Sequence, residues 1–507
     1  MQTDTISYDR LIGKEDSQAL VENDIIVPED EPDVLNVIAV NALTIINNIE
    51  ADEGKIHIDG ELRLNILYTP DKKGSLIKID KSIDFSHFFE VEGCDSKCRA
   101  LVAARVEHVD YSVINSRKIN IKAILSISGS VFSKEMKDIV VNIEDIEDME
   151  YLKKTIKYLN TIGQNDVETF LKEQIKIPDG ALEIDRIIKV DTIIKSDEYR
   201  ITDNRVMIQG NIHAVVLYTT KNKGEFEKLE CDLNYDNFIE IPGALSYMNA
   251  KTNEAIIEKN VEVLEDDNGE NRILNIELVV KTNAVVTEIE EREIPVDVYS
   301  ITRNIEPERE IITTINRSVG ATSQVILKEA IELKNNARKI IDIIAYPVIS
   351  NYTMSDKKVL IEGVIDYNAM YLNDEGYINS SKGEFPFKTF VDVQNDEGVP
   401  FLDLKISHVS YEIIAMKEVE MKFVMDVYVD IFYEESFDVL TDIKEVEEGR
   451  YEKNKHSITI YMVQKNDNLW DIAKKYRTSK DDILNINEIN DEKLIAGTKL
   501  IIPIKAQ

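Results

Sequence analysis

An internal repeat constrains the fold of this chain of 507 residues more than any other feature of the sequence. Residues 28–93 match residues 178–243 at a constant offset and without a gap, and a third copy follows with a one-residue slip. A glycine and a tyrosine recur at matching points of the three copies: Gly60, Gly210 and Gly363, and Tyr68, Tyr218 and Tyr371. Self-similarity of this length indicates three homologous domains. We place them at residues 15–145, 165–290 and 318–436.

Each copy is predicted to be mainly β. In the first copy, apolar residues alternate with polar ones over residues 56–66 and again over 119–121, which is the period of a half-buried strand. Residues 102–114 and 118–132 are two such runs with a short connection, as in a β-hairpin. We therefore expect three tandem β-sandwich-like repeats.

The recurring residues of the repeats have structural explanations. The repeated glycines indicate a bulge or a close approach of another group to the backbone, and the repeated tyrosines are expected to pack into the cores. The lysine-glycine pairs at 73–74 and 223–224 indicate hairpin loops. His108 and His408 recur in alternating strand patterns, and we interpret them as structural residues rather than as a site.

Two segments between the domains have different patterns. Residues 146–164 carry an apolar stripe at helical spacing, which predicts a helical connector between the first two copies. The stripe consists of Ile146, Met149, Leu152, Ile156 and Leu159. Residues 437–457 end in a charged run that is poor in apolar residues, which predicts a flexible linker.

Residues 458–505 are predicted to form a small unit of their own. Residues 458–463 alternate in polarity, as in a strand, and Asp467 or Asn468 can cap a helix whose apolar residues repeat every three or four positions. A second capped helix follows, and a short apolar run that ends at Pro503 suits a closing strand. The expected order of elements is βααβ.

The motif residues of this unit resemble those of the LysM module. The agreement in order and spacing covers Tyr461-x-Val463, Asn466-Asp467-Asn468-Leu469, Ile472-Ala473, Asn487, Leu494-x-x-Gly497-x-x-Leu500 and Ile502-Pro503. LysM modules generally bind N-acetylglucosamine polymers in a shallow groove between two loops. The resemblance therefore implies a candidate glycan groove: Asn466, Asp467, Asn468, Leu469, Leu494 and Gly497.

One groove position departs from the LysM pattern. Asn466 stands where the family has a glycine. Asparagine tolerates the left-handed backbone region better than most residues, so the turn can still form. Because the change falls in the groove itself, it disfavours sugar binding.

The first strand of the same unit predicts a surface for a protein partner. If Val463 faces the helices, then Ile458, Ile460 and Met462 face outward as an exposed apolar strip, and such strips mark binding sites. Trp470 is the single tryptophan of the chain and lies one step off the buried helix stripe, so we count it among the partner-binding candidates. A tryptophan that partly covers the small core would have the same position, and this alternative stays open.

The charge and the termini limit the classes of partner and compartment. The net charge is −35 at pH 7, whereas a protein that binds nucleic acid or an anionic membrane needs the opposite sign. The sequence has no secretory signal at its N-terminus and no apolar run long enough to span a membrane, so we expect a cytoplasmic protein without membrane insertion. The three cysteines suit a reducing compartment.

Motifs for catalysis or for metal binding are missing from the sequence. It contains no phosphate-binding loop, no His-Glu-x-x-His and no Gly-x-Ser-x-Gly, so we expect no catalytic residues and no enzyme. It also contains no calcium loop, and Cys94 and Cys98 have no second ligand pair at zinc spacing. We therefore expect neither a metal nor a cofactor.

The whole architecture, three β-rich repeats and one C-terminal LysM module, resembles a family of clostridial spore-morphogenesis proteins whose repeat was long catalogued as a domain of unknown function. The resemblance implies a non-enzymatic adaptor in the mother-cell cytoplasm, peripheral at the forespore surface, where the spore coat and cortex assemble. It also implies that the LysM module docks on stage IV sporulation protein A, the coat-basement ATPase, and it allows contacts between the repeats and other coat proteins. The alternative is a protein attached to N-acetylglucosamine of peptidoglycan or cortex, which is disfavoured because that glycan lies outside the membrane.

Overall fold

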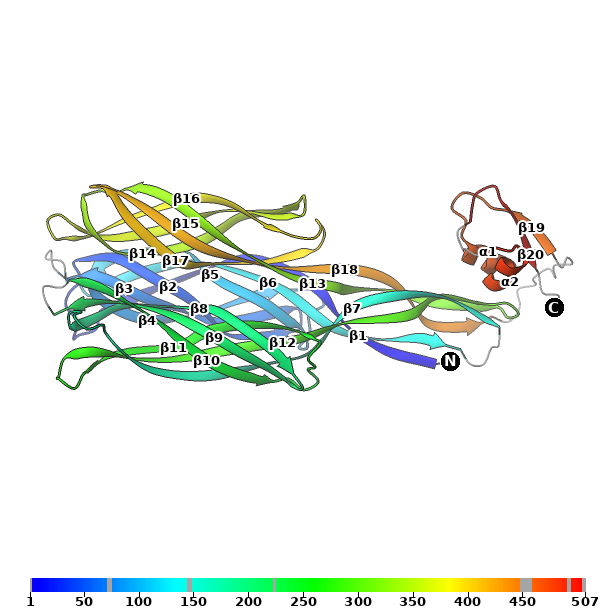
Figure 1. Cartoon of the computed structure of the whole chain (residues 1–507), viewed down its shortest axis with the longest axis horizontal. Helices are drawn as coiled ribbons and strands as arrows, with labels where there is room; N and C mark the ends of the chain where they lie inside the picture. The colour runs from blue at the N-terminus through cyan, green and yellow to red at the C-terminus, as the bar shows by residue number, and fades with distance from the viewer. Residues whose placement is uncertain are drawn as a thin grey trace.

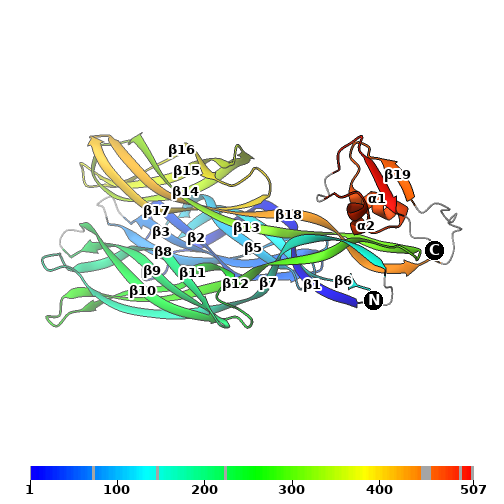
Figure 2. The same ribbon diagram turned by 45° about the vertical axis from the view of Figure 1, so that its right-hand side comes forward.

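The chain folds into a long β-rich body, a narrower stalk and a small C-terminal unit at the far end of the stalk (Figures 1 and 2). The computed structural model describes residues 2–70, 75–143, 148–221, 225–446, 458–489 and 494–503. In these residues nearly all regular structure is β, which confirms the predicted fold class. The loops predicted at 73–74 and 223–224 lie outside the described residues.

Each repeat consists of six strands in two three-stranded antiparallel sheets. The first contains β1 (Gln2–Ile26), β2 (Asn36–Asp52), β3 (Lys55–Thr69), β4 (Ile77–Glu90), β5 (Arg99–Asn115) and β6 (Lys118–Asn142). The second contains β7 (Met149–Lys176), β8 (Ile184–Thr202), β9 (Arg205–Thr220), β10 (Phe226–Glu240), β11 (Asn249–Glu265) and β12 (Asn271–Ser300). The third contains β13 (Ile305–Glu332), β14 (Ala337–Ser355), β15 (Lys358–Asn373), β16 (Ile378–Asp392), β17 (Val399–Ala415) and β18 (Glu418–Glu445). The sheets β2-β3-β4 and β1-β6-β5 of the first repeat have counterparts of the same order in the other two.

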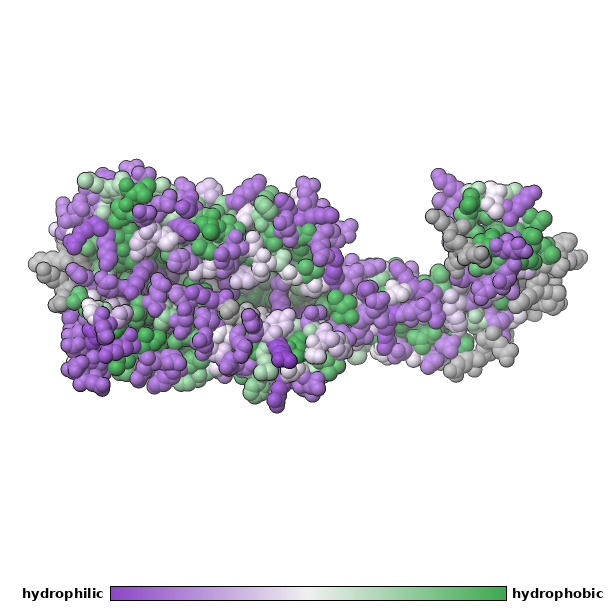
Figure 3. Space-filling model, viewed as in Figure 1, coloured by the Kyte–Doolittle hydropathy of each residue, from purple (hydrophilic) through white to green (hydrophobic). Residues whose placement is uncertain are grey.

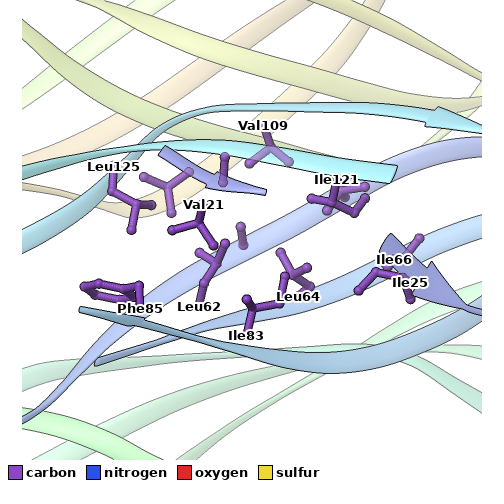
Figure 4. Packing of buried hydrophobic residues seen from close by; sticks show 14 of the residues in the cluster. Val21, Ile25, Leu62, Leu64, Ile66, Ile83, Phe85, Val109, Ile121 and Leu125 are labelled. Carbon is purple, nitrogen blue, oxygen red and sulfur yellow. The ribbon is translucent and has the colours of Figure 1, made fainter. Parts of the chain in front are cut away.

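The two sheets of a repeat bury their facing side chains in one core. Figure 4 shows this core in the first repeat, where side chains of β1, β3, β4, β5 and β6 point toward one another. Along β3, Leu62, Leu64 and Ile66 are buried and alternate with more exposed residues, because successive side chains of a strand point to opposite faces. Each repeat is therefore a β-sandwich, as the alternation predicted.

A glycine in the central strand of each repeat lies opposite an aromatic residue. The pairs are Gly60 and Phe85, Gly210 and Tyr235, and Gly363 and Phe387. A Cβ atom on Gly60 would lie 2.6 Å from Cζ of Phe85 and 2.5 Å from the carbonyl oxygen of Ile45, so no side chain fits there. The predicted close approach is confirmed. The repeated tyrosines are buried, also as predicted: Tyr68, Tyr218 and Tyr371.

The three repeats pack around a shared apolar cluster to which each of them contributes. It consists of Ile38, Ala39, Leu67 and Leu76 of the first repeat, Ile188, Leu217 and Phe226 of the second, and Ile341, Ile344, Met370 and Ile378 of the third. Ala39, Lys189 and Asp342 occupy equivalent strand positions at this cluster. Lys189 donates to the Asp342 carboxylate at 2.6 Å, and both side chains are buried. The second and third repeats therefore carry opposite charges at this position, where the first repeat has the uncharged Ala39.

The stalk is built from the outer ends of six long strands. The pairs β1–β6, β7–β12 and β13–β18 extend beyond the sandwiches as three two-stranded ribbons that pack together (Figure 1). Their shared core contains Ile6, Tyr8, Ile139, Ile156, Tyr158, Ile294, Ile312, Phe437 and Val439. The three ribbons thus bury one another's apolar side chains. This packing shields the parts of the strands that extend beyond the sandwiches from solvent.

Two predictions about the connecting segments are wrong. From Met149 onward, the helical connector predicted at 146–164 is part of strand β7, in which the buried Ile156 and Tyr158 alternate with exposed neighbours. Packing in the stalk overrides the helical spacing of the stripe, and Ile146 lies outside the described residues. The linker predicted at 437–457 is strand β18 up to Glu445, since Phe437 and Val439 also face the stalk core. Residues 447–457 lie outside the described residues.

Candidate partner-binding site

The C-terminal unit has the predicted βααβ order, with β19 (Ile458–Met462), α1 (Leu469–Tyr476), α2 (Lys480–Ile486) and β20 (Lys499–Pro503). The side chain of Asn468 accepts from the Asp471 backbone N–H at 2.8 Å and caps α1, and Ser479 caps α2 in the same way. The helices cover one face of the two-stranded sheet through a small core. That core includes Val463, Leu469, Ile472, Ala473, Ile483, Leu500 and Ile502.

The opposite face of the sheet carries an apolar strip. Ile458, Ile460 and Met462 are 54%, 69% and 49% exposed, and Ile501, which pairs with Ile460 across the sheet, is 38% exposed. We call these four residues the outer strip. Figure 3 shows hydrophobic residues gathered on the visible face of the C-terminal unit. The outward orientation of the first three agrees with the alternation in the sequence, while their role in binding stays a prediction.

The backbone of β19 also has an open edge. The Val463 N–H donates to the Thr498 carbonyl at 2.9 Å, so the alternating pattern of an antiparallel pair turns the N–H and C=O groups of Ile458, Ile460 and Met462 away from β20. Among the described residues, none hydrogen-bonds to these backbone groups. The other edge of the sheet is closed, because the Asn487 amide bonds both the N–H and the C=O of Ile501.

The residues of the candidate glycan groove mainly hold the loops in place. Asn466 has a φ of 73°, so it adopts the left-handed conformation that the sequence required of it. The Asp467 carboxylate accepts from the Tyr461 hydroxyl and the Gln464 N–H, both at 2.8 Å, and these bonds lower its pKa. Gly497 has a φ of 89° and donates to the Val463 carbonyl.

The apolar members of the groove set serve the core. Leu469 is buried in the core of the domain, and Leu494 is half-buried and packs against that core. The turns at Asn466 and Gly497 are formed, whereas the Asp467 carboxylate is already engaged within the chain. Glycan binding by this set stays a prediction.

Trp470 lies away from the outer strip. It is only 5% exposed, its Nε1 donates to Oδ2 of Asp297 at 2.7 Å, and its ring meets that of Tyr299 edge-on at 4.9 Å between centroids. Asp297 and Tyr299 belong to β12 at the tip of the stalk. The structure thus separates Trp470 from the strip residues with which the sequence grouped it, and it adds two stalk residues that the sequence did not single out.

The repeated histidine of the first repeat joins two repeats. Nδ1 of His108 lies 2.7 Å from Oδ2 of Asp366 in the third repeat, and one carboxylate oxygen of Glu384 is nearby. Burial raises the pKa of Asp366, although His108 opposes this effect. The contact agrees with the structural role expected for His108. His408 lies in β17 opposite Val424.

Cys94 and Cys98 lie in the loop between β4 and β5. Cys94 is buried, and its thiol lies within hydrogen-bonding distance of the Lys55 carbonyl. Burial, together with the neighbouring Cys98 and Asp95, raises the pKa of Cys94 to about 12, so the reactive thiolate is disfavoured.

Comparison with known protein families identifies both parts of the chain. The SipL SPOCS domain matches residues 33–114, 183–264 and 336–414, which correspond to β2–β5, β8–β11 and β14–β17, and the LysM domain matches residues 461–503. No curated protein and no solved structure matches the chain. No helix in the described part of the chain is long and apolar enough to cross a membrane. With three SipL SPOCS domains followed by a C-terminal LysM domain, the chain has the domain arrangement of SipL.

Proposed function

We propose that this protein is a non-enzymatic adaptor of spore assembly that docks on a protein partner through the outer strip of its LysM domain. The observation that carries the proposal is the strip itself, four partly exposed apolar side chains on one sheet face of a small domain. The SPOCS and LysM domains belong to non-catalytic families with a link to sporulation through SipL, which supports an adaptor rather than an enzyme.

The strip offers two kinds of contact to a partner. Its side chains can bury apolar area, and fully burying one large aliphatic side chain is worth about 1.5–3 kcal/mol. The open edge of β19 can in addition pair with an extended segment of the partner. Both contacts lie on a domain at the end of the stalk, where a partner can approach without meeting the body (Figure 1).

Stage IV sporulation protein A, the coat-basement ATPase, is the partner that the family resemblance suggests. In this proposal the protein works in the mother-cell cytoplasm at the forespore surface, where the repeats offer further surfaces to coat proteins. When one chain makes several weak contacts, the first contact that forms raises the effective concentration for the others.

A second candidate function is glycan binding by the LysM domain. LysM domains typically bind peptidoglycan-like glycans, and the turn at Asn466 has the left-handed backbone conformation that favours glycine. This function is disfavoured because Asn466 replaces the glycine of the LysM pattern within the groove set, and because the Asp467 carboxylate is engaged by Tyr461.

The test compares two variants for binding to purified stage IV sporulation protein A. Ile460→Asp places a charge in the middle of the strip, and we expect its affinity to fall at least about tenfold, because burying an unpaired charge in an apolar contact is costly. Met416→Asp changes an exposed apolar residue of the body and serves as the control, with unchanged affinity. Equal affinity of Ile460→Asp and the wild type, with both folded, would refute a role of the strip.

A further inference from the structure

The LysM domain is attached to the stalk by a polar contact centred on Asp297. Besides the bond from Trp470, the carboxylate of Asp297 accepts from Nζ of Lys474 at 2.7 and 2.8 Å, and it pairs with Arg309 of the neighbouring ribbon. The Asp297 side chain is largely buried. Burial alone would raise its pKa, but the bonds from Lys474 and Trp470 outweigh burial and lower it, so the charged form is the one that the contact stabilises.

Three further interactions surround the carboxylate. Tyr299 packs edge-on against Trp470 and donates its hydroxyl to the Thr478 carbonyl at 2.7 Å, just beyond the end of α1. Arg477 donates to the side chain of Asn304, which precedes β13. The contact therefore engages one whole side of α1 and the turn that follows it.

A β-bulge aims Asp297 at the LysM domain. The register between β7 and β12 shifts at Val296, and the Asp297 carboxylate also accepts from the Val298 N–H at 2.8 Å. The other two ribbons have the same device, in which Asn142 and Asp442 follow a bulge and accept from the next N–H.

The second ribbon alone combines the bulge carboxylate with an aromatic residue that contacts the LysM domain. Two positions after Asp297 stands Tyr299, whereas two positions after Asp442 stands Lys444, which cannot pack edge-on against an indole. The LysM core cluster includes Tyr299 and Ile301 from the end of the second ribbon. The docking position is thus specified by residues that differ between otherwise equivalent ribbons.

We infer that Asp297 and Tyr299 form an intramolecular docking site for Trp470, and that this latch fixes the orientation of the LysM domain on the stalk. Trp470 is then a positioning residue, which acts within the chain and leaves the contact with a partner to the outer strip. The strip is free in the latched state, since its four residues remain exposed there. The inference does not depend on the identity of the partner.

The single tryptophan makes the latch directly measurable in the full-length protein. Trp470 fluorescence and its quenching by acrylamide report how far the indole is shielded from solvent. We expect the wild type to be shielded, and Asp297→Ala to shift the emission to longer wavelength and to increase quenching, because losing charge-assisted bonds weakens docking by about tenfold or more.

Asp442→Ala is the matched control, since it removes the equivalent bulge carboxylate from the third ribbon without touching the LysM domain. Lys474→Ala tests the other side of the contact, in case Asp297→Ala disturbs the stalk, and far-ultraviolet circular dichroism checks the fold of each variant. A rise in quenching for Lys474→Ala and Asp297→Ala but not for Asp442→Ala supports the latch. Quenching that is the same in all four folded proteins would overturn it.

Discussion

The buried charge cluster between the second and third repeats gives the most quantitative prediction about stability. Asp342 accepts from Lys189 at 2.6 Å and from Lys228 at 2.8 Å, in contact with the apolar cluster that the three repeats share. Asp342→Ala removes the acceptor and leaves Lys189 buried with one remaining carboxylate, that of Asp191 at 2.7 Å.

The size of the effect follows from this geometry. Removing one partner of a buried ion pair costs about 3–5 kcal/mol, because the other charge stays buried and unpaired. Lys189 keeps Asp191, which is partly exposed, and Lys228 is exposed enough to turn toward solvent. We therefore expect the free energy of unfolding to fall by roughly 3 kcal/mol, at the lower end of that range.

The assay is urea denaturation followed by circular dichroism, with two further variants. Glu362→Ala breaks the exposed pair with Lys388 and should cost no more than about 1 kcal/mol. Combining Asp342→Ala with Lys189→Met removes the stranded charge as well, so it should be more stable than Asp342→Ala alone. The reasoning is refuted if Asp342→Ala costs no more than Glu362→Ala, or if the added Lys189→Met restores nothing.

Two other predictions concern the glycine pairs and the latch. Gly60→Ala should destabilise the first repeat by about 1–3 kcal/mol, because the added Cβ would overlap Phe85 and the Ile45 carbonyl. A Cβ added at Gly320 would lie 3.4 Å from its nearest neighbour, so Gly320→Ala should change the stability little. Equal urea midpoints for the two variants would contradict this expectation. Because the pKa of Asp297 is lowered in the docked state, docking is fully stabilised above the ordinary carboxyl value of about 3.9 and weakens as pH falls through the lowered value. Trp470 emission should therefore stay constant from about pH 8 to pH 5 and move to longer wavelength below about pH 4, and a shift that begins near neutral pH would point to another group.

Local patterns in the sequence were enough to predict the elements that pack against their own neighbours. The alternation in β3 predicts a sandwich strand, and the alternation in β19 predicts which side chains of the LysM sheet face outward. In both cases the period of two reports burial within one small unit, where neighbouring strands are close in sequence.

The stalk and the latch depend on contacts between distant segments. Residues 146–164 have helical spacing, yet Ile156 lies in a cluster of side chains from all three ribbons. Its neighbours in that cluster are distant in sequence, so the local pattern does not predict its burial there. Trp470 contacts Asp297, which lies 173 residues earlier, so the sequence shows an unassigned tryptophan but not its partner. The ion pair of Lys189 and Asp342 is a further case. The repeat in the sequence aligns the two positions, but their contact depends on how the repeats assemble.

The central claim is that the LysM domain serves as a protein-docking module. The most direct measurement titrates the full-length protein in parallel with purified stage IV sporulation protein A and with chitin or peptidoglycan oligomers by calorimetry. We expect the full-length protein to bind stage IV sporulation protein A, with an affinity that Ile460→Asp lowers, and not to bind the glycans. Binding to the glycans alone, unchanged in Ile460→Asp, would contradict the account and assign the LysM domain to the cortex or wall.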